Sequence, residues 1–218
     1  MSSIIVKTEP AQEPVTLQEV KEYLRVEDST DERTIRPLIE TARRFAEEHM
    51  GRALFSTTFT QYYDSVSDMD SPLWEGMRTG PYLNYYKNYL TLGKSPAVSV
   101  THVKTYDDSD NATTMENTKY YVDSGREPAR IVLRTGESFP TALRVANAIE
   151  VEYVAGYSSI YSIPEPIRMG ILQHIAHLYE HRGDMYEAKL AYPPMLKSLY
   201  SAYVVHKGLG SSTLMSVG

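Results

Sequence analysis

Apolar residues recur at helical spacing near both ends of the chain and alternate with polar residues in its middle. Near the N-terminus, Leu17, Val20 and Leu24 share one side of a segment that starts at Thr16. Thr16 and Glu19 have the spacing of a capping box, in which each side chain bonds the backbone N–H of the other residue. The pattern therefore predicts a short helix from Thr16 to about Val26.

A second, longer amphipathic helix is predicted between Asp28 and Gly51. Its apolar positions follow the i, i+3, i+4, i+7 spacing of one helix face: Ile35, Leu38, Ile39, Ala42, Phe45 and Ala46. Gly51 is a suitable C-terminal stop because glycine adopts the left-handed conformation common there. Pro37 requires either that the helix begins near Thr34, with the proline in its first turn, or that it kinks.

The middle of the chain has short alternating runs separated by turn residues, which is typical of strands. Five strands are predicted, over residues 55–63, 98–103, 120–122, 129–133 and 149–154. This spacing favours a small antiparallel sandwich or barrel. Residues 64–90 begin rich in Asp and Ser and then become aromatic, which predicts an exposed aromatic loop carrying Trp74, Tyr82, Tyr85, Tyr86 and Tyr89.

Helical spacing returns after Ile163-Pro164, where Ile167, Ile171, Ile175 and Leu178 form an apolar stripe. A last helix is predicted after Pro193-Pro194, with Leu196, Leu199, Tyr200, Tyr203 and Val204 on its apolar side. The predicted fold class is α+β: a four-helix bundle from the N- and C-terminal segments with an inserted small antiparallel β-sandwich or barrel. The expected divisions are 1–53 (helical), 54–157 (β-rich), 158–207 (helical) and 208–218 (a flexible C-terminal tail).

Composition narrows the function. The 218 residues include no cysteine, which excludes disulfides and thiolate metal sites. No apolar run approaches the roughly 20 residues of a membrane span, and the N-terminal run is too short for a signal peptide, so we expect a protein made in the cytoplasm. A net charge of −6 disfavours tight DNA binding but allows passive contact with DNA in a channel. The 18 tyrosines fit either a tyrosine-rich core or protein–protein contacts.

The sequence offers little that suggests catalysis. His174, His177 and His181 lie on one flank of the predicted third helix and have the residue type of zinc ligands. There is no HExxH pattern and no distant ligand stands out, so packed or interfacial histidines are favoured over a metal site. Neither a GxSxG elbow nor a phosphate-binding glycine loop occurs. We expect no enzyme activity, no cofactor and no metal.

Several segments, in their order and spacing, are typical of one family. They are residues 15–26, 38–48, 51–54, 96–106, 121–123, 128–131, 151–157, 163–168, 171–182 and 193–194. Together the chain resembles the head–tail connector (adaptor, or head-completion) family of tailed bacteriophages and gene transfer agents over roughly residues 15–205. It departs from the family in Pro37 and in the longer, more aromatic segment 64–90.

The resemblance implies a structural protein of the virion that forms a homo-oligomeric ring, expected to be twelvefold, beneath the portal protein. Such a ring links the DNA-filled head to a tail or stopper protein, with DNA passing through its channel. It would assemble in the cytoplasm of the host bacterium. Expected contact residues are Leu209, Leu214 and Met215 of the tail, then Trp74, Tyr82, Tyr85 and Tyr86. Arg43, Arg44, Glu47 and Glu48 form either a charged contact rim or a solvated helix face.

A different class of function also fits some of these features. Exposed tyrosines and one tryptophan on a β scaffold could stack on sugars, as in a carbohydrate- or receptor-binding β module of a virion. The helical segments, and not the β segments, carry the clearest patterns, which favours the connector. A glycan-binding assay on the purified chain would separate the two interpretations.

Overall fold

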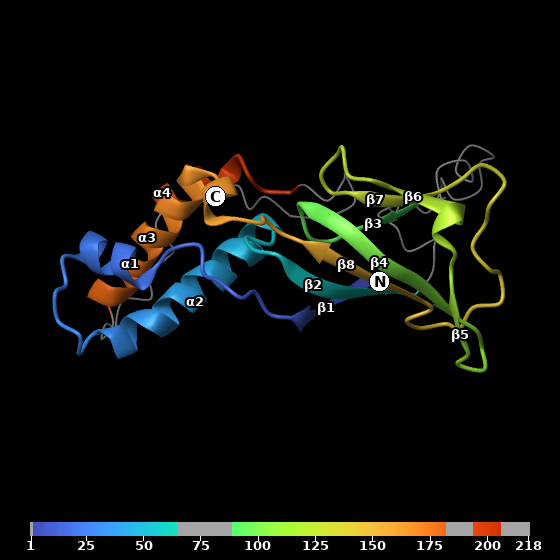
Figure 1. The fold of residues 1–218 in the computed structure, drawn as a ribbon, viewed down its shortest axis with the longest axis horizontal. Helices are drawn as coiled ribbons and strands as arrows, with labels where there is room; N and C mark the ends of the chain where they lie inside the picture. The colour runs from blue at the N-terminus through green and yellow to red at the C-terminus, as the bar shows by residue number, and fades with distance from the viewer. Residues whose placement is uncertain (1, 65–88, 182–193, 206–218) are drawn as a thin grey trace, which may run out of the picture. The chain divides into compact units, whose positions relative to one another are not determined.

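The computed structural model describes residues 2–64, 89–181 and 194–205 and divides them into a helical unit and a β-rich unit. Described residues of the helical unit are 10–56, 156–181 and 194–204, so both ends of the chain contribute to it. The β-rich unit contains residues 2–9, 57–64 and 89–155. The α+β class is confirmed, with four helices and antiparallel sheets in the described part of the chain (Figure 1).

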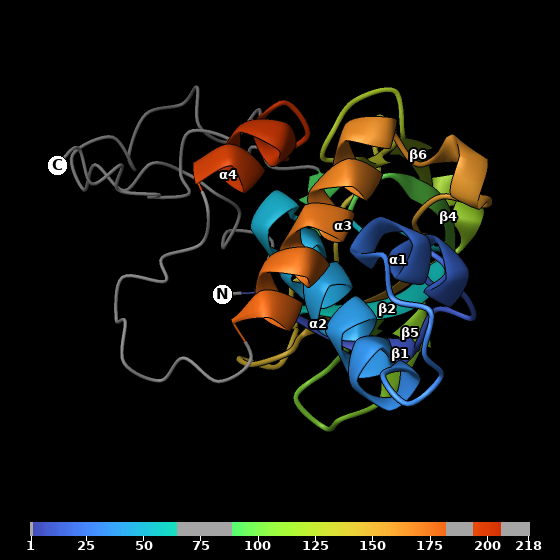
Figure 2. The ribbon, with the colours of Figure 1, turned by 90° about the vertical axis from the view of Figure 1, so that its left-hand side faces the viewer.

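The helical unit contains α1 (Leu17–Leu24), α2 (Glu32–Met50), α3 (Glu165–Glu180) and α4 (Pro194–Ser201). Figure 2 shows α1, α2 and α3 packed side by side, with α4 beside α3. Their common core includes Val20, Ile35, Ile171 and Tyr200, all fully buried. Because α1 and α4 have only eight residues each, the structure does not show a regular four-helix bundle.

The predicted helix starts and stops are largely confirmed. Thr16 caps α1 with both hydrogen bonds of the capping box, and Gly51 ends α2 with a φ of 68°. The α2 helix begins at Glu32 and not near Thr34, the first of the two alternatives, so Pro37 lies in its second turn. The Thr41 hydroxyl donates to the Pro37 carbonyl at 2.8 Å, the bond to the i−4 carbonyl that threonine often makes inside a helix.

Over its described residues, the β-rich unit has two antiparallel sheets and shows no closed sandwich or barrel. The first has the order β1-β2-β8-β4-β5, with β1 (Ser2–Thr8), β2 (Thr57–Tyr63), β4 (Ala97–Tyr106), β5 (Ala112–Thr114) and β8 (Ile149–Ala155). The second has the order β3-β7-β6, with β3 (Tyr89–Thr91), β6 (Tyr120–Asp123) and β7 (Arg130–Leu133). All five predicted strands are present; β1, β3 and β5 were not predicted.

Period-two alternation explains the faces of the central strand β8. Ile149, Val151 and Tyr153 are fully buried, whereas Glu150 and Glu152 between them are only partly covered. Buried polar side chains of this sheet form hydrogen bonds with β3 and with the residues that follow it. The Gln61 amide oxygen accepts a hydrogen bond from Gly93 N at 2.9 Å. The Tyr63 hydroxyl also donates to the Thr91 carbonyl at 2.6 Å.

The helical unit begins later in the chain than the expected helical segment 1–53, because strand β1 comes first. Residues 2–9 belong to the β-rich unit, where β1 pairs with β2 in register Ser2↔Tyr63 to Val6↔Phe59. The run Ser2–Thr8 holds three consecutive apolar residues and does not alternate, so periodicity alone does not assign it to a strand. Among the described helices, none is long and apolar enough to cross a membrane.

Candidate interaction surfaces

The four charged residues predicted on the polar side of α2 separate into a largely covered pair, Arg43 and Glu47, and an exposed pair, Arg44 and Glu48. Arg43 is only 4% exposed, and its guanidinium binds Glu13 at 2.8 Å and Glu47 at 2.9 Å. The other carboxylate oxygen of Glu47 accepts from Leu54 N at 2.8 Å. Arg43 therefore does not lie on a solvated face. It joins the segment before α1 to the turn after α2.

Arg44 and Glu48 do lie on the accessible surface of α2. Arg44 forms an i, i+4 ion pair with Glu40 at 2.9 Å, and both side chains are at least half exposed. Exposed pairs of this kind contribute little to stability. Arg44 and Glu48 are consequently the members of the predicted rim that a partner could contact.

The histidines of α3 do not converge on one point. His174 is buried with its ring edge against Phe45, at 5.0 Å between centroids, whereas His177 contacts His181 at 4.4 Å. Burial lowers the pKa of His174, and the neighbouring His177 lowers it further. Within residues 2–64, 89–181 and 194–205, no group of three or more His, Asp or Glu side chains could hold a metal ion. His174 is a packed core residue.

The outer face of the five-stranded sheet carries a charged cluster that sequence reasoning missed. The Glu150 carboxylate binds His102 Nε2 at 3.0 Å, lies 3.7 Å from Lys104 Nζ, and accepts from the Tyr106 hydroxyl at 2.7 Å. Burial raises the pKa of Glu150, but the hydrogen bonds from His102 and Tyr106 outweigh it, so its pKa lies below 4.5. The bond to Glu150 also raises the pKa of Tyr106 to about 12.

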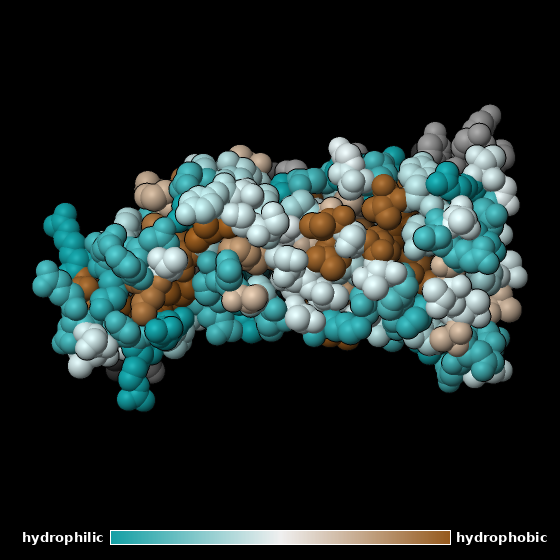
Figure 3. Space-filling model, in the orientation of Figure 1, coloured by the Kyte–Doolittle hydropathy of each residue, from teal (hydrophilic) through white to brown (hydrophobic). Residues whose placement is uncertain are grey.

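Apolar side chains lie beside these charges on the same sheet. Val98 is 64% exposed and Ile5 is 57% exposed. Figure 3 shows hydrophobic residues reaching the surface in the region of β4 and β8. The partly exposed side chains of His102, Lys104 and Glu152 lie on the same sheet, which therefore presents both apolar and charged groups.

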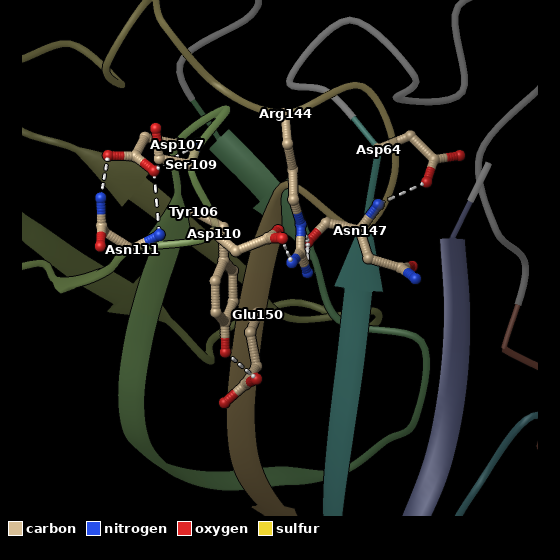
Figure 4. Close-up of polar contacts among 9 residues, drawn as sticks. All are labelled: Asp64, Tyr106, Asp107, Ser109, Asp110, Asn111, Arg144, Asn147 and Glu150. Atoms are coloured by element: carbon tan, nitrogen blue, oxygen red, sulfur yellow. Dashed lines mark hydrogen bonds and ion pairs between the residues drawn. The ribbon is translucent and has the colours of Figure 1, made fainter.

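A second polar cluster closes one end of the β-rich unit (Figure 4). Arg144 donates to the Asn147 carbonyl, binds Asp110 at 3.0 Å, and lies 4.1 Å over the Tyr106 ring. Asn147 N in turn donates to Asp64 at 3.0 Å. Asp110 and Asn147 adopt positive φ, which Asp and Asn tolerate. The cluster therefore holds the β4–β5 turn, the segment before β8 and the end of β2 together.

Seven of the predicted contact residues lie outside the described part of the chain. They are Trp74, Tyr82, Tyr85, Tyr86, Leu209, Leu214 and Met215. Tyr89, the last aromatic residue of the predicted loop, is described and begins β3. Its ring lies under the Arg130 guanidinium, 5.2 Å from the centroid.

Comparison with solved structures shows which proteins share this fold. A chain in the neck of the empty GTA particle, computed with C6 symmetry, matches with a TM-score of 0.72 over 95% of this chain and 98% of that chain. The protein shares its fold with chains of gene transfer agent particles. The sequence identity of that match is 17%, which supports a shared fold and nothing finer.

Two further structures agree. A chain in the virion of the native gene transfer agent particle matches with a TM-score of 0.67 at 16% identity, covering 95% of this chain and 97% of that chain. A chain in the neck of the native GTA particle, computed with C12 symmetry, matches with a TM-score of 0.60 at 19% identity, over 94% and 98%. No family model and no curated protein sequence matches the chain.

Proposed function

We propose that this protein is a structural head–tail connector (adaptor) of a tailed phage or phage-like particle, acting in the virion and without catalysis. The observation that carries the proposal is the near-complete coverage of both chains in the match to the GTA neck structure. The similarity spans nearly the whole chain, and so includes both units and not one common module. Fold alone does not fix function, but the segments that suggested the connector family from the sequence point the same way.

In this proposal, copies of the chain form a ring of twelve beneath the portal and carry the tail or stopper protein. The C6 and C12 symmetry of the two neck structures supports a rotationally symmetric assembly. A ring of this kind needs two unlike surfaces that meet head to tail. The net charge of −6 suits a channel through which DNA passes without being held.

Three sets of residues are proposed to make the contacts. The C-terminal tail, with Leu209, Leu214 and Met215, docks on the portal or on a neighbouring copy and becomes ordered there. Trp74, Tyr82, Tyr85 and Tyr86 contact an adjacent copy or a tail protein. Arg44 and Glu48, the exposed members of the α2 set, lie at the charged rim of the ring contact.

Particle assembly tests the proposal directly. Without the gene for this chain, electron micrographs should show filled heads and free tails that remain unjoined, and restoring the gene should rejoin them. Labelled protein should be found at the head–tail junction. Normal tailed particles in the absence of the chain would refute the connector role.

Two variants then test the contact residues. A chain lacking residues 208–218 should fold normally, judged by its circular dichroism, yet fail to attach to heads. Replacing Trp74 and Tyr82 together by serine should weaken assembly, whereas replacing only the exposed Val145 by serine serves as the control. Unchanged attachment by the shortened chain would show that the tail is not the docking segment.

A further inference from the structure

The five-stranded sheet ends in two open edges. Strand β1 is outermost on one side and pairs only with β2 among the described residues. On the opposite side, β5 covers only Lys104–Tyr106 of β4. Within the described chain, the stretch Ala97–His102 pairs with β8 alone, so its other edge is open. Open strand edges present unpaired N–H and C=O groups that can add another strand.

The two runs with open edges in the described chain contain neither lysine nor proline. The residues of β1 up to Val6 read Ser-Ser-Ile-Ile-Val, and those of β4 from Ala97 read Ala-Val-Ser-Val-Thr, with no charged side chain in either run. Natural edge strands are commonly protected by lysine or proline. Lys7 lies just beyond the first run, where it binds Glu152 on the sheet itself.

The side chains of the two edges also suit each other. Ile5 is 57% exposed and Val6 is 44% exposed on one edge, and Val98 is 64% exposed on the other. β-Branched residues facing one another across adjacent strands stabilise a sheet. Register shifts at Ala97/Ser99 and Val100/His102 bend the β4 edge, which limits any added ladder to a short one.

Strand direction permits the two edges to join between identical chains. Each neighbouring pair in the order β1-β2-β8-β4 is antiparallel, so β1 and β4 run in opposite directions. Suppose that a second copy lies beside the first in the same orientation. The β4 strand of the second copy is then antiparallel to β1 of the first, and the antiparallel order of strands continues across the contact. Two unlike edges that match in this way form a head-to-tail contact, as a ring requires.

We propose that β1 of one copy adds to the Ala97–Thr101 edge of β4 in the next copy, so that the five-stranded sheet continues from subunit to subunit. The inference rests on the proposed function for the presence of a ring, and it names the surface that closes that ring. Main-chain hydrogen bonds give this strand addition its affinity, and the exposed β-branched side chains set its register.

Cysteine cross-linking tests the contact well because the chain contains no cysteine. A protein with Ser3→Cys is mixed in turn with four proteins that carry a single cysteine at position 98, 99, 100 or 101. Each mixture is assembled into rings, oxidised and separated on a non-reducing gel. Facing Cα atoms in an antiparallel pair are about 4.5–5.5 Å apart, within the span of a disulfide. The control partner carries Val145→Cys, at a site that is 91% exposed.

The expected result is a cross-linked dimer that peaks at one of the four positions and is lost with the Val145 partner. Rings that form normally with no cross-link at any of the four positions would overturn the inference while leaving the connector role intact. A cross-link with Ser3→Cys alone would instead indicate β1-to-β1 pairing and would also overturn it. If no rings or connectors form under any condition, the proposed function fails.

A second variant tests the same contact without cysteine. Ile5→Lys places a charge at the β1 edge and should leave a folded chain, because Ile5 is already more than half exposed. Mass photometry should show loss of the ring for this variant. Val145→Lys, which adds the same charge elsewhere on the β-rich unit, should form rings normally. Equal ring formation by both variants would contradict the proposed contact.

Discussion

Replacing Arg43 by alanine should destabilise the helical unit strongly, although a helix-surface pattern would place this residue in solvent. The Arg43 side chain is 5% exposed and makes two charged hydrogen bonds, to Glu13 and Glu47. Removing one partner of a buried ion pair costs about 3–5 kcal/mol. Glu13 is 36% exposed and regains water easily, so we expect a loss of about 3 kcal/mol, at the lower end of that range.

Urea unfolding followed by circular dichroism at the helix band measures this loss. With a urea slope of about 2–3 kcal/mol per M, the midpoint should fall by about 1 M or more. Arg43→Lys should recover only part of it, because an ammonium cannot reproduce the fixed fork of a guanidinium. Arg44→Ala is the matched control, since Arg44 is 58% exposed and pairs with Glu40 on the surface. Equal midpoints for the Arg43→Ala and Arg44→Ala proteins would refute the reasoning.

Two other predictions concern a glycine and a carboxylate. Gly156→Ala should cost at least about 3 kcal/mol, because φ is +118° and the new Cβ would lie 2.0 Å from the Phe55 carbonyl oxygen. Gly136→Ala, with φ at +89° but nothing within 4 Å, should cost only the strain of about 1–2 kcal/mol; equal urea midpoints for the two would contradict the steric argument. The pKa of Glu150 is lowered from 4.5 by folding, so its contribution to stability is present above pH 4.5 and is lost as pH falls through the lower folded value. In the Glu150→Gln protein, the free energy of unfolding should therefore fall less steeply as the pH is lowered. Glu116 is exposed, so Glu116→Gln should leave the pH dependence unchanged. Parallel pH profiles of the Glu150→Gln and unaltered proteins would contradict this role of Glu150.

The family suggested by the sequence and the fold similarity found from the structure rest on different grounds. The first depends on short segments in a particular order, none of which is specific alone. The second depends on the path of the backbone, which matches at a TM-score of 0.72 despite 17% identity. Their agreement is why a connector is proposed, and the assembly experiments decide it.

Local patterns determined most of the secondary structure of this protein. The Thr16 capping box, the Gly51 stop, the apolar stripe through Ile171 and the alternation along β8 each act within a few residues. Helical and strand periodicities are short-range properties, so they can be recognised from sequence alone. Strands β1 and β3 could not be recognised in this way, because each forms by pairing with a strand distant in the chain, and β5 has only three residues, too few to show a period.

Only the tertiary structure decided which charges are buried and which are exposed. Arg43 and Arg44 are adjacent and alike in sequence, yet one is buried between Glu13 and Glu47 while the other is exposed. Periodicity assigns a residue to one side of a helix, but it does not say whether another segment covers that side. The segment carrying Glu13 covers Arg43, and distant strands bring Glu150 against His102 and Tyr106. These long-range contacts separate the charged residues that stabilise the fold from those that remain exposed.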